Sequence, residues 1–199
     1  MTTAHDSAPT PASAVTQYYV ASSLDGFIAD PHDNLDWLLQ FGFDDFQEHY
    51  DRFLADVGAL VMGAATYEFV LGEGPEAWTY GTMPVWVLTH RELPSVEGAN
   101  IVFSAEPVET VHRDALAAAG GKNVWVMGGG DVAAQFADRG LLDEIWLSVM
   151  PIVLGAGKPL LPVASISRPL ELVRTTSFDL GAIELVYRLG QRSGPEVLR

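Results

Sequence analysis

Three consecutive glycines, Gly128 to Gly130, stand between a buried apolar run and a run of helical spacing. Glycine has no Cβ to keep a ligand away from the backbone, and the first N–H groups of a helix attract anionic oxygens. A strand, a glycine turn and a helix in this order can therefore hold a pyrophosphate. A tight turn without a ligand is the alternative. Asp131 follows, and we expect its carboxylate to cap the helix and to compete with a phosphate for the same amides.

Other chemistries are excluded by residues that the chain lacks. It has no cysteine, and its five histidines show no metal-ligand spacing, so no metal site is expected. Neither a Gly-x-Ser-x-Gly turn nor a Gly-Lys-Ser/Thr loop occurs. A net charge of −15, from 26 acidic and 11 basic residues, disfavours binding of nucleic acid. No apolar run approaches the roughly 20 residues that span a bilayer, so no membrane role is expected.

The elements that must position the glycines alternate along the chain. Apolar and β-branched runs predict strands at residues 15–23, 59–62, 84–89, 100–103 and 123–127. Helical spacing predicts helices at residues 44–57, 64–71, 106–119 and 131–138. Three longer β-type runs follow, at residues 141–153, 170–178 and 183–189. A turn at residues 179–182 joins the last two as an antiparallel hairpin. The alternation predicts an α/β fold whose mixed, mostly parallel sheet carries helices on both faces.

A single domain accounts for the chain, because 199 residues match the usual size of one unit and no linker divides them. We expect it to span residues 15–190, between a disordered N-terminal tail at 1–14 and a C-terminal tail at 191–199. The first tail lacks the basic start and the apolar segment of a secretory signal, which favours a cytoplasmic location. Residues 24–36 are rich in turn formers and form a loop long enough to cover a site.

Several segments resemble, in the same order along the chain, motifs of the dihydrofolate-reductase-like family. VWVMGGGDVAAQF at residues 124–136 resembles the strand, glycine turn and helix that bind the dinucleotide in that family. SSLDG at residues 22–26 is similar to the SLDG motif of the reductase domain of bifunctional riboflavin-biosynthesis deaminase-reductases and their stand-alone relatives, and VMGAATYE at 61–68 to their MGRxTYE motif. The resemblance continues through residues 141–161 and covers residues 15–189. It implies a dihydrofolate-reductase-like, three-layer α/β/α fold.

The resemblance also implies an NADPH site at the ends of these strands. The residues carried over to it are Gly63, Thr66, Thr89, Met127, Gly128, Gly129, Gly130, Asp131 and Val132. Gly63 could also simply end a strand, and Thr66 could cap a helix. The arginine that usually follows the glycine in MGRxTYE is Ala64 here, so one phosphate-binding cation is missing. His90 and Arg91, directly after Thr89, could supply a cation to a ribose 2′-phosphate, which favours NADPH over NADH. A solvated loop charge is the alternative for Arg91.

A second departure from the family concerns the substrate. The riboflavin-pathway reductases commonly carry a lysine directly after SLDG, and this chain has Phe27. Together with the acidic net charge, Phe27 favours a neutral or flat aromatic substrate over a phosphorylated sugar. We expect Ser23, Phe27 and Trp37 to bind the substrate. The protein core is the alternative place for the Trp37 indole.

Proton delivery in dihydrofolate reductases uses a carboxylate on the helix after the first loop, in a pocket that raises its pKa. The acids near that place are Asp44, Asp45 and Glu48, and their spacing selects none of them. A solvated acidic helix start is the alternative for all three. Asp25, at the mouth of the loop after the first strand, is our candidate catalytic acid. It could instead belong to an Asp-Gly turn, in which the carboxylate bonds only its own backbone.

Taken together, these residues predict an NADPH-dependent reductase that transfers a hydride to a conjugated C=N or C=O bond of a small substrate, such as a heterocycle, with residues 24–36 closing over the cofactor. One alternative is the riboflavin-pathway 5-amino-6-(5-phosphoribosylamino)uracil reductase, against which Phe27 argues. The other is a non-catalytic nucleotide-binding or stress-associated dimer with the same fold. The resemblance also implies a homodimer through the C-terminal strands, which would cover an exposed sheet edge.

Overall fold

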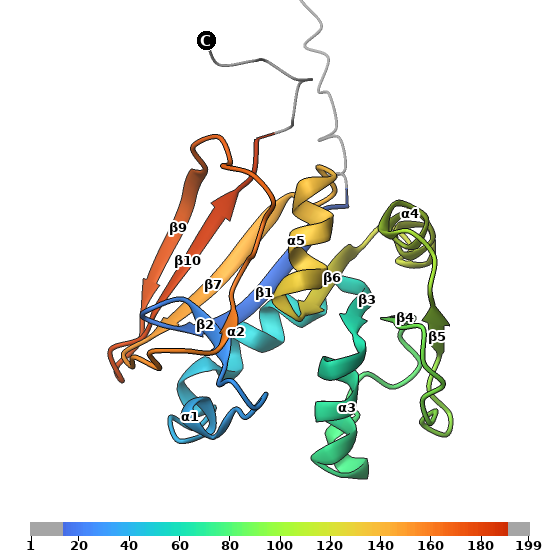
Figure 1. Ribbon diagram of the computed structural model, residues 1–199, viewed down its shortest axis with the longest axis horizontal. Helices are drawn as coiled ribbons and strands as arrows, with labels where there is room; N and C mark the ends of the chain where they lie inside the picture. The colour runs from blue at the N-terminus through green and yellow to red at the C-terminus, as the bar shows by residue number, and fades with distance from the viewer. Residues whose placement is uncertain (1–13, 191–199) are drawn as a thin grey trace, which may run out of the picture.

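An eight-stranded sheet with helices on both faces forms the body of the protein, as the computed structural model in Figure 1 shows. The structure describes residues 14–190. The tails predicted at residues 1–14 and 191–199 lie outside this range, apart from residue 14. No helix within residues 14–190 is long and apolar enough to cross a bilayer. The architecture is the α/β class that the alternating sequence pattern predicts.

The large sheet has the strand order β5-β4-β3-β6-β1-β7-β10-β9. Its strands, in chain order, are β1 (Thr16–Ser23), β3 (Val57–Gly63), β4 (Val85–Leu88), β5 (Ile101–Ser104), β6 (Asn123–Gly128), β7 (Glu144–Met150), β9 (Glu171–Ser177) and β10 (Ile183–Arg188). A two-stranded sheet pairs β2 (Phe27–Ala29) with β8 (Lys158–Pro159). The helices are α1 (Asp36–Leu39), α2 (Asp44–Ala55), α3 (Ala64–Gly72), the short 3₁₀ helix η1 (Pro75–Ala77), α4 (Val108–Ala118) and α5 (Gly130–Asp138).

Strand directions agree with the predicted mixed sheet. Neighbouring strands are parallel all along the order β5-β4-β3-β6-β1-β7. Strand β10 is antiparallel to both of its neighbours, β7 and β9. A tight turn joins β9 to β10, in which the Phe178 N–H donates to the Ala182 carbonyl at 2.9 Å. Gly181 in this turn has a φ of +83°, a conformation that favours glycine. The predicted hairpin at the end of the chain is therefore confirmed.

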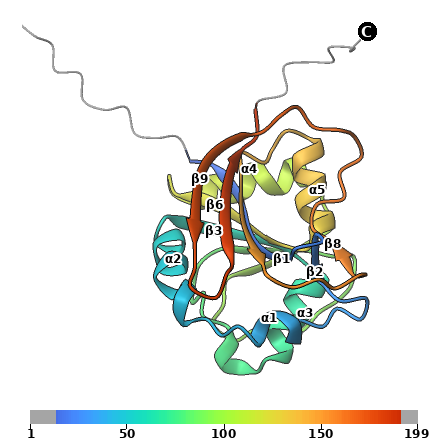
Figure 2. The ribbon, with the colours of Figure 1, turned by 90° about the vertical axis from the view of Figure 1, so that its left-hand side faces the viewer.

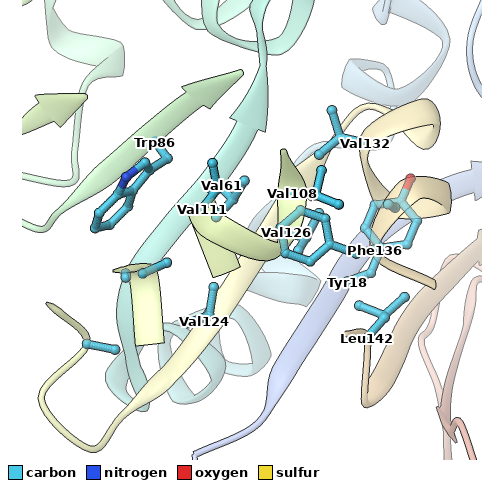
Figure 3. Packing of buried hydrophobic residues seen from close by; sticks show 14 of the residues in the cluster. Tyr18, Val61, Trp86, Val108, Val111, Val124, Val126, Val132, Phe136 and Leu142 are labelled. Carbon is cyan, nitrogen blue, oxygen red and sulfur yellow. The ribbon is translucent and has the colours of Figure 1, made fainter. Parts of the chain in front are cut away.

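Helices cover the two faces of the sheet, so the fold has the three layers that the resemblance implies. Figure 2 shows α5 and α2 on opposite sides of the strands. On the α4 and α5 face, Val111 and Phe136 pack with Tyr18 of β1 in one buried cluster (Figure 3). On the other face, Phe53 of α2 packs with Trp125 of β6. Each fully buried side chain of this size contributes about 1.5–3 kcal/mol, which fixes the helices on the sheet.

The segment of residues 24–36 is tied down along its length. Its strand β2 pairs with β8, and the Leu24 N–H donates to the Ile152 carbonyl at 2.7 Å. The ammonium group of Lys158 lies 3.2 Å from the carboxylate of Asp33. The segment predicted as a turn-rich loop thus contains a short strand and is bonded to the segment around β8. These bonds join positions more than 100 residues apart, whereas turn formers report only on local structure.

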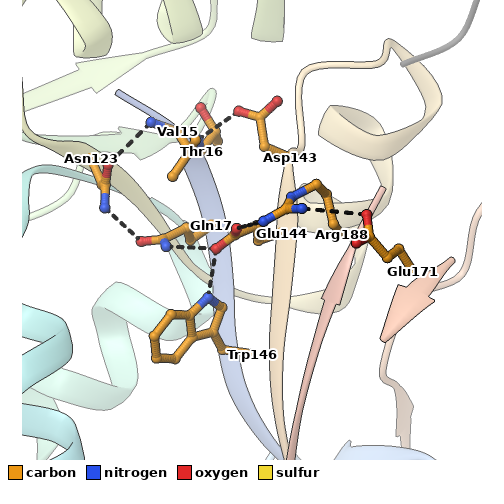
Figure 4. A network of polar contacts seen from close by, with 9 residues as sticks. All are labelled: Val15, Thr16, Gln17, Asn123, Asp143, Glu144, Trp146, Glu171 and Arg188. Atoms are coloured by element: carbon orange, nitrogen blue, oxygen red, sulfur yellow. Dashed lines mark hydrogen bonds and ion pairs between the residues drawn. The ribbon is translucent and has the colours of Figure 1, made fainter. Parts of the chain in front are cut away.

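Polar side chains gather at the N-terminal ends of β1, β6 and β7 (Figure 4). The carboxylate of Glu144 accepts hydrogen bonds from Gln17 Nε2 and Trp146 Nε1, both at 3.0 Å. The amide of Asn123 donates to Gln17 Oε1 at 3.2 Å. Arg188 of β10 pairs with Glu144 at 3.6 Å. Buried polar groups are thus paired at this end of the sheet, away from the carboxyl ends of the parallel strands.

His112 of α4 lies against the start of β1, where its Nε2 atom is 2.8 Å from the Thr16 hydroxyl. Burial lowers the pKa of His112, and the charge of Asp143 partly opposes this shift. Between the ordinary pKa of 6.5 and the lower folded value, the unfolded chain binds a proton that the folded chain does not. The stability that neutral His112 provides is therefore present above the ordinary pKa and is lost as the pH falls through this window.

Replacing His112 with glutamine should remove this pH dependence and keep a polar partner for Thr16. The wild-type protein should lose more unfolding free energy between about pH 7.5 and about pH 5.5 than His112→Gln does, as measured by urea unfolding at each pH. Equal losses in the two proteins would contradict the neutral, buried state of His112.

Candidate active site

Two helix N-termini meet at the carboxyl ends of the neighbouring strands β3 and β6. The strands pair in parallel, with Met62 opposite Gly128. Gly63, the last residue of β3, is the N-cap of α3, and Gly129, directly after β6, is the N-cap of α5. The unpaired N–H groups and positive dipole ends of both helices therefore lie close together. Such a place can hold the anionic oxygens of a pyrophosphate.

The three glycines of the turn differ in what requires them. Gly128 has a φ of +145°, which disfavours any other residue. A Cβ on Gly130 would lie 2.1 Å from the Pro159 carbonyl oxygen, so close packing requires glycine there. Neither reason holds at Gly129, where φ is −78° and a Cβ would meet only Ile28 Cδ1, at 3.9 Å. The space beside Gly129 is a cradle that a side chain would fill, and it fits a ligand lying against the first amides of α5.

Thr66 and Val132, which are also predicted for the cofactor site, lie against Gly128 and Gly63 beside the cradle, and the predicted role of Asp131 is corrected. A Cβ added to Gly128 would lie 3.3 Å from the hydroxyl of Thr66, in the first turn of α3. A Cβ added to Gly63 would lie 3.2 Å from Val132 Cγ2. Asp131 is exposed in the first turn of α5, and no side chain caps this helix. The predicted capping role of Asp131 is therefore wrong, because α5 begins one residue earlier than expected and its cap is a glycine.

The segment after β4 carries the predicted cation. Thr89, His90 and Arg91 follow the carboxyl end of β4, the neighbour of β3 in the sheet. The Arg91 N–H donates to the Thr89 hydroxyl at 2.9 Å. The guanidinium of Arg91 is exposed and donates two hydrogen bonds to the Glu68 carboxylate, at 2.9 and 2.7 Å. A phosphate at this place would compete with Glu68 for the N–H donors of the Arg91 guanidinium.

Asp25 holds a neighbouring loop. Its carboxylate oxygens accept hydrogen bonds from the N–H groups of Leu154 at 3.0 Å and Gly155 at 2.7 Å. The bond from Leu154 is the main cause that lowers the pKa of Asp25 below its ordinary value. An exposed carboxylate held as an anion has no proton to give at neutral pH, so the geometry argues against the predicted catalytic role. An Asp-Gly turn is present, since the Gly26 N–H donates to the Ser23 carbonyl at 3.0 Å, but the carboxylate bonds the remote N–H groups of Leu154 and Gly155 as well.

A cavity of about 490 Å³ lies beside the glycine turn, on the sheet face that α2 and α3 cover. Its lining consists of Tyr19, Val20, Ala21, Leu35, Leu38, Gly42, Phe43, Phe46, Gln47, Tyr50, Thr66, Phe69, Val70, Tyr80, Trp125, Met127, Ser148 and Met150. Thr66 and Met127 are also predicted cofactor residues, so the cavity and the cradle adjoin. None of the lining side chains is a carboxylate, an ammonium or a guanidinium. Because a charge without a partner is costly to bury, the cavity suits an uncharged molecule with flat, apolar surfaces.

No acid of α2 reaches this cavity. The three candidates are exposed on the helix surface: Asp44, Asp45 and Glu48. The α2 side chains that line the cavity are Phe46, Gln47 and Tyr50. The solvated acidic helix start, the alternative for these three residues, is therefore what the structure shows.

Two tyrosines in the cavity wall are functional candidates that the sequence did not reveal. Tyr50 and Tyr80 both line the cavity, and the Tyr80 hydroxyl donates to the sulfur of Met127 at 3.8 Å. Burial is the main cause that raises the pKa of each tyrosine. Both hydroxyls therefore stay protonated at neutral pH. Tyr50 stands among the apolar positions of the helix predicted at residues 44–57, where its aromatic ring indicates packing. Tyr80 follows η1 in an irregular segment without a recognisable pattern.

The three predicted substrate residues lie elsewhere. Trp37 is buried in a cluster with Met150, the core position that was its alternative. Ser23 is buried, and its hydroxyl accepts a hydrogen bond from the Phe27 N–H at 3.0 Å. Phe27 pairs with Pro159 in the small sheet. None of the three lines the apolar cavity. Ser23 and Phe27 shape the turn into β2, and Trp37 packs the core.

A smaller hollow of about 230 Å³ lies at the opposite ends of the strands. It is lined by Gln17, His49, Arg52, Phe53, Asp56, Asn123, Trp146 and Arg174. The guanidinium of Arg174 lies 4.6 Å from the centre of the Trp146 ring and 2.9 Å from the buried carboxylate of Glu184. Arg52 and Arg174 are therefore grouped away from the glycine turn and its cavity.

Comparisons with known proteins agree with the fold of the chain. The model of the RibD C-terminal domain matches residues 15–183. The Bacillus subtilis (strain 168) protein "Uncharacterized protein YwjB" is 30% identical over 172 residues, which cover 86% of this chain and 96% of the relative. The crystal structure of "Putative riboflavin biosynthesis protein" from Shewanella sp. PV-4 is 26% identical, with a TM-score of 0.74, and the match covers 88% of this chain and 99% of that one. Dihydrofolate reductase from Enterococcus faecalis, complexed with NADP(H) and RAB-propyl, shares the fold at 19% identity and a TM-score of 0.57, over 88% of this chain and 96% of its own. The predicted resemblance is confirmed.

Proposed function

Because the chain belongs to the RibD C-terminal domain family, we propose that it is an NADPH-dependent reductase of a small, flat and uncharged substrate. The reaction is transfer of a hydride to a conjugated C=O or C=N bond. The observation that carries the proposal is the open cradle at Gly129, which adjoins a cavity without charged lining through Thr66 and Met127. A dinucleotide and an apolar substrate can thus be held side by side.

NADPH fits the groups that the chain presents. The first amides of α5 and α3 would bind the pyrophosphate, and Thr66 would offer its hydroxyl to the same oxygens. Arg91 would meet the ribose 2′-phosphate in competition with Glu68. The complex of the Enterococcus faecalis dihydrofolate reductase with NADP(H) supports this choice of cofactor. NADPH supplies the hydride when bound, and the protein's own part is to orient both molecules and keep water away from them.

An uncharged substrate is favoured over the phosphoribosylamino uracil of the riboflavin pathway. A substrate phosphate needs cations at its binding site, because burying it without partners is costly. The cavity lining offers none, and Arg52 and Arg174 lie at the other ends of the strands. The riboflavin-pathway reaction is therefore the weaker candidate for this chain.

Replacing Gly129 with alanine tests the cradle. The added methyl group has room in the folded protein, so the unfolding free energy should stay within about 1 kcal/mol of the wild type. The methyl group should occupy the space that the pyrophosphate needs, and it should weaken NADPH binding at least about tenfold in calorimetric titration. Gly72→Ala is the matched control, because Gly72 also lies in open space and is remote from the turn. Unchanged NADPH affinity in Gly129→Ala would contradict the proposed site, and a wild-type protein that binds no nucleotide would favour the non-catalytic alternative.

Arg91 tests the preference for the 2′-phosphate. Arg91→Ala should weaken NADPH binding by about three- to tenfold and leave NADH binding unchanged, since only NADPH carries the phosphate that the guanidinium would meet. Arg113→Ala, which removes an exposed arginine paired with Asp114 on α4, is the control. An equal loss for both nucleotides, or no loss for either, would speak against this role of Arg91.

We also propose that the protein forms a homodimer through its C-terminal strands. The edge strand β9 is exposed along nearly its whole length and carries Leu172, 52% exposed, and Val173, 44% exposed. Covering by a second chain is one way to protect an edge of this kind. Light scattering coupled to gel filtration should give twice the chain mass of 21.5 kDa, and Leu172→Glu should lower the mass toward that of one chain. A monomeric wild-type protein would refute the dimer.

A further inference from the structure

A buried serine hydroxyl without a protein partner faces the apolar cavity. Ser148 of β7 is 5% exposed and lines the cavity. Within residues 14–190, the other buried polar side chains all have hydrogen-bond partners: Thr16, Gln17, Ser22, Ser23 and Glu184. The Ser148 hydroxyl has no such partner in this part of the chain. An unpaired buried polar group in a native fold is rare and requires an explanation.

The surroundings of Ser148 give its hydroxyl no structural task. Ala21, its register partner on β1, and Met150, two residues further along β7, are apolar and also line the cavity. Glu184, its register partner on β10, accepts a hydrogen bond from Arg174 at 2.9 Å and makes none with Ser148. Leaving a buried hydroxyl unpaired lowers the stability of a fold, and alanine at this position would avoid that cost. A group of this kind that faces a cavity points to a ligand.

The cavity extends from the glycine turn to Ser148 across three neighbouring strands. The strands contribute Met127 of β6, Tyr19 and Ala21 of β1, and Ser148 of β7. Strand β1 lies between β6 and β7 (Figure 1), so two strand spacings, about 10 Å, separate Ser148 from the strand that ends in the glycine turn. Ser148 therefore lies at the end of the cavity that is remote from the proposed cofactor.

Other polar side chains of the lining are placed differently. The Tyr80 hydroxyl donates to the sulfur of Met127, next to the glycine turn. Gln47 is exposed, and its amide donates to the Asp51 carboxylate at 2.7 Å. Among the described residues, Ser148 is the one polar side chain of the lining that is more than nine-tenths buried. A hydrogen bond to a ligand is worth most where water is excluded, which favours Ser148.

Building on the proposed reductase function, we propose that the Ser148 hydroxyl binds the substrate by donating a hydrogen bond to a carbonyl oxygen remote from the carbon that accepts the hydride. The ligand is then a flat, uncharged molecule of about two fused rings, with a carbonyl edge at one end and its reacting carbon at the other. An anionic edge does not fit, because the Glu184 carboxylate is the neighbour of Ser148 across the sheet and no cation lines the cavity. The hydrogen bond decides which end of the substrate faces the cofactor.

Two flat, uncharged ligands of similar size test this assignment without any nucleotide. Coumarin has a carbonyl oxygen that accepts a hydrogen bond, and naphthalene has no such acceptor. We expect both ligands to bind the wild-type protein in equilibrium dialysis. Ser148→Ala should weaken coumarin binding about three- to tenfold, the usual worth of one hydrogen bond, and leave naphthalene binding unchanged.

The stability of the ligand-free protein gives a second, independent readout. Ser148→Ala should keep the urea midpoint at or above the wild-type value, because alanine removes a hydroxyl that has no partner to lose. Ser22→Ala is the matched control, since the buried Ser22 hydroxyl donates to the Ser23 carbonyl at 3.0 Å and Ser22 does not line the cavity. This control should lower the urea midpoint and leave the binding of both ligands unchanged.

The proposal is overturned if Ser148→Ala weakens both ligands equally, if it weakens neither, or if the wild-type protein binds neither. It is also overturned if Ser148→Ala lowers the urea midpoint as far as Ser22→Ala does, because the hydroxyl would then stabilise the fold itself. Since neither measurement contains NADPH, a failure of the proposed cofactor site would show in the Gly129→Ala and Arg91→Ala titrations and leave this result intact.

Discussion

The parallel pairing of β3 with β6 is the constraint on which the candidate site depends. It sets Met62 opposite Gly128 and so brings the N-termini of α3 and α5 together at one edge of the sheet. Both helix starts can then act on the same anion, although the effect of a helix dipole falls off within one turn. The clusters on both faces, with Phe136 on one side and Phe53 on the other, hold the two strands and their helices in this relation.

Charge is separated along the strands in a way that matches the proposed chemistry. At the N-terminal ends, Glu144 pairs with Arg188, and further along the sheet the buried carboxylate of Glu184 pairs with Arg174. At the carboxyl ends, the site consists of backbone amides, hydroxyls and apolar side chains. A hydride and a proton can be delivered to an uncharged molecule there without any buried charge that lacks a partner. The segment of residues 24–36 contributes fixed walls, because Asp25 and β2 tie it to the segment around β8.

Sequence patterns predicted those features that are encoded locally. The strand at residues 123–127, the turn at Gly128 to Gly130 and the C-terminal hairpin all follow from apolar runs and turn formers next to one another in the chain. The β2–β8 ladder was missed because two strands of three and two residues leave no periodic pattern. The cavity was missed because it is assembled from side chains of separate strands and helices, and an aromatic residue such as Tyr50 has the same signature in a core as in a binding site. The hydrogen bonds of Asp25, which argue against its predicted catalytic role, could not be predicted because only the folded chain brings the N–H groups of Leu154 and Gly155 to it.

The dinucleotide that we propose lies against the N-termini of α3 and α5. Amide NMR spectra of the ¹⁵N-labelled protein, recorded during a titration with NADPH, test this placement most directly, since each amide reports its own surroundings. We predict that the signals of residues 63–66 and 128–132 shift together and saturate with one affinity, whereas those of Gln17, His49 and Asn123, at the opposite strand ends, stay in place. Signals that do not move at the glycine turn, or shifts confined to the polar hollow, would contradict the account.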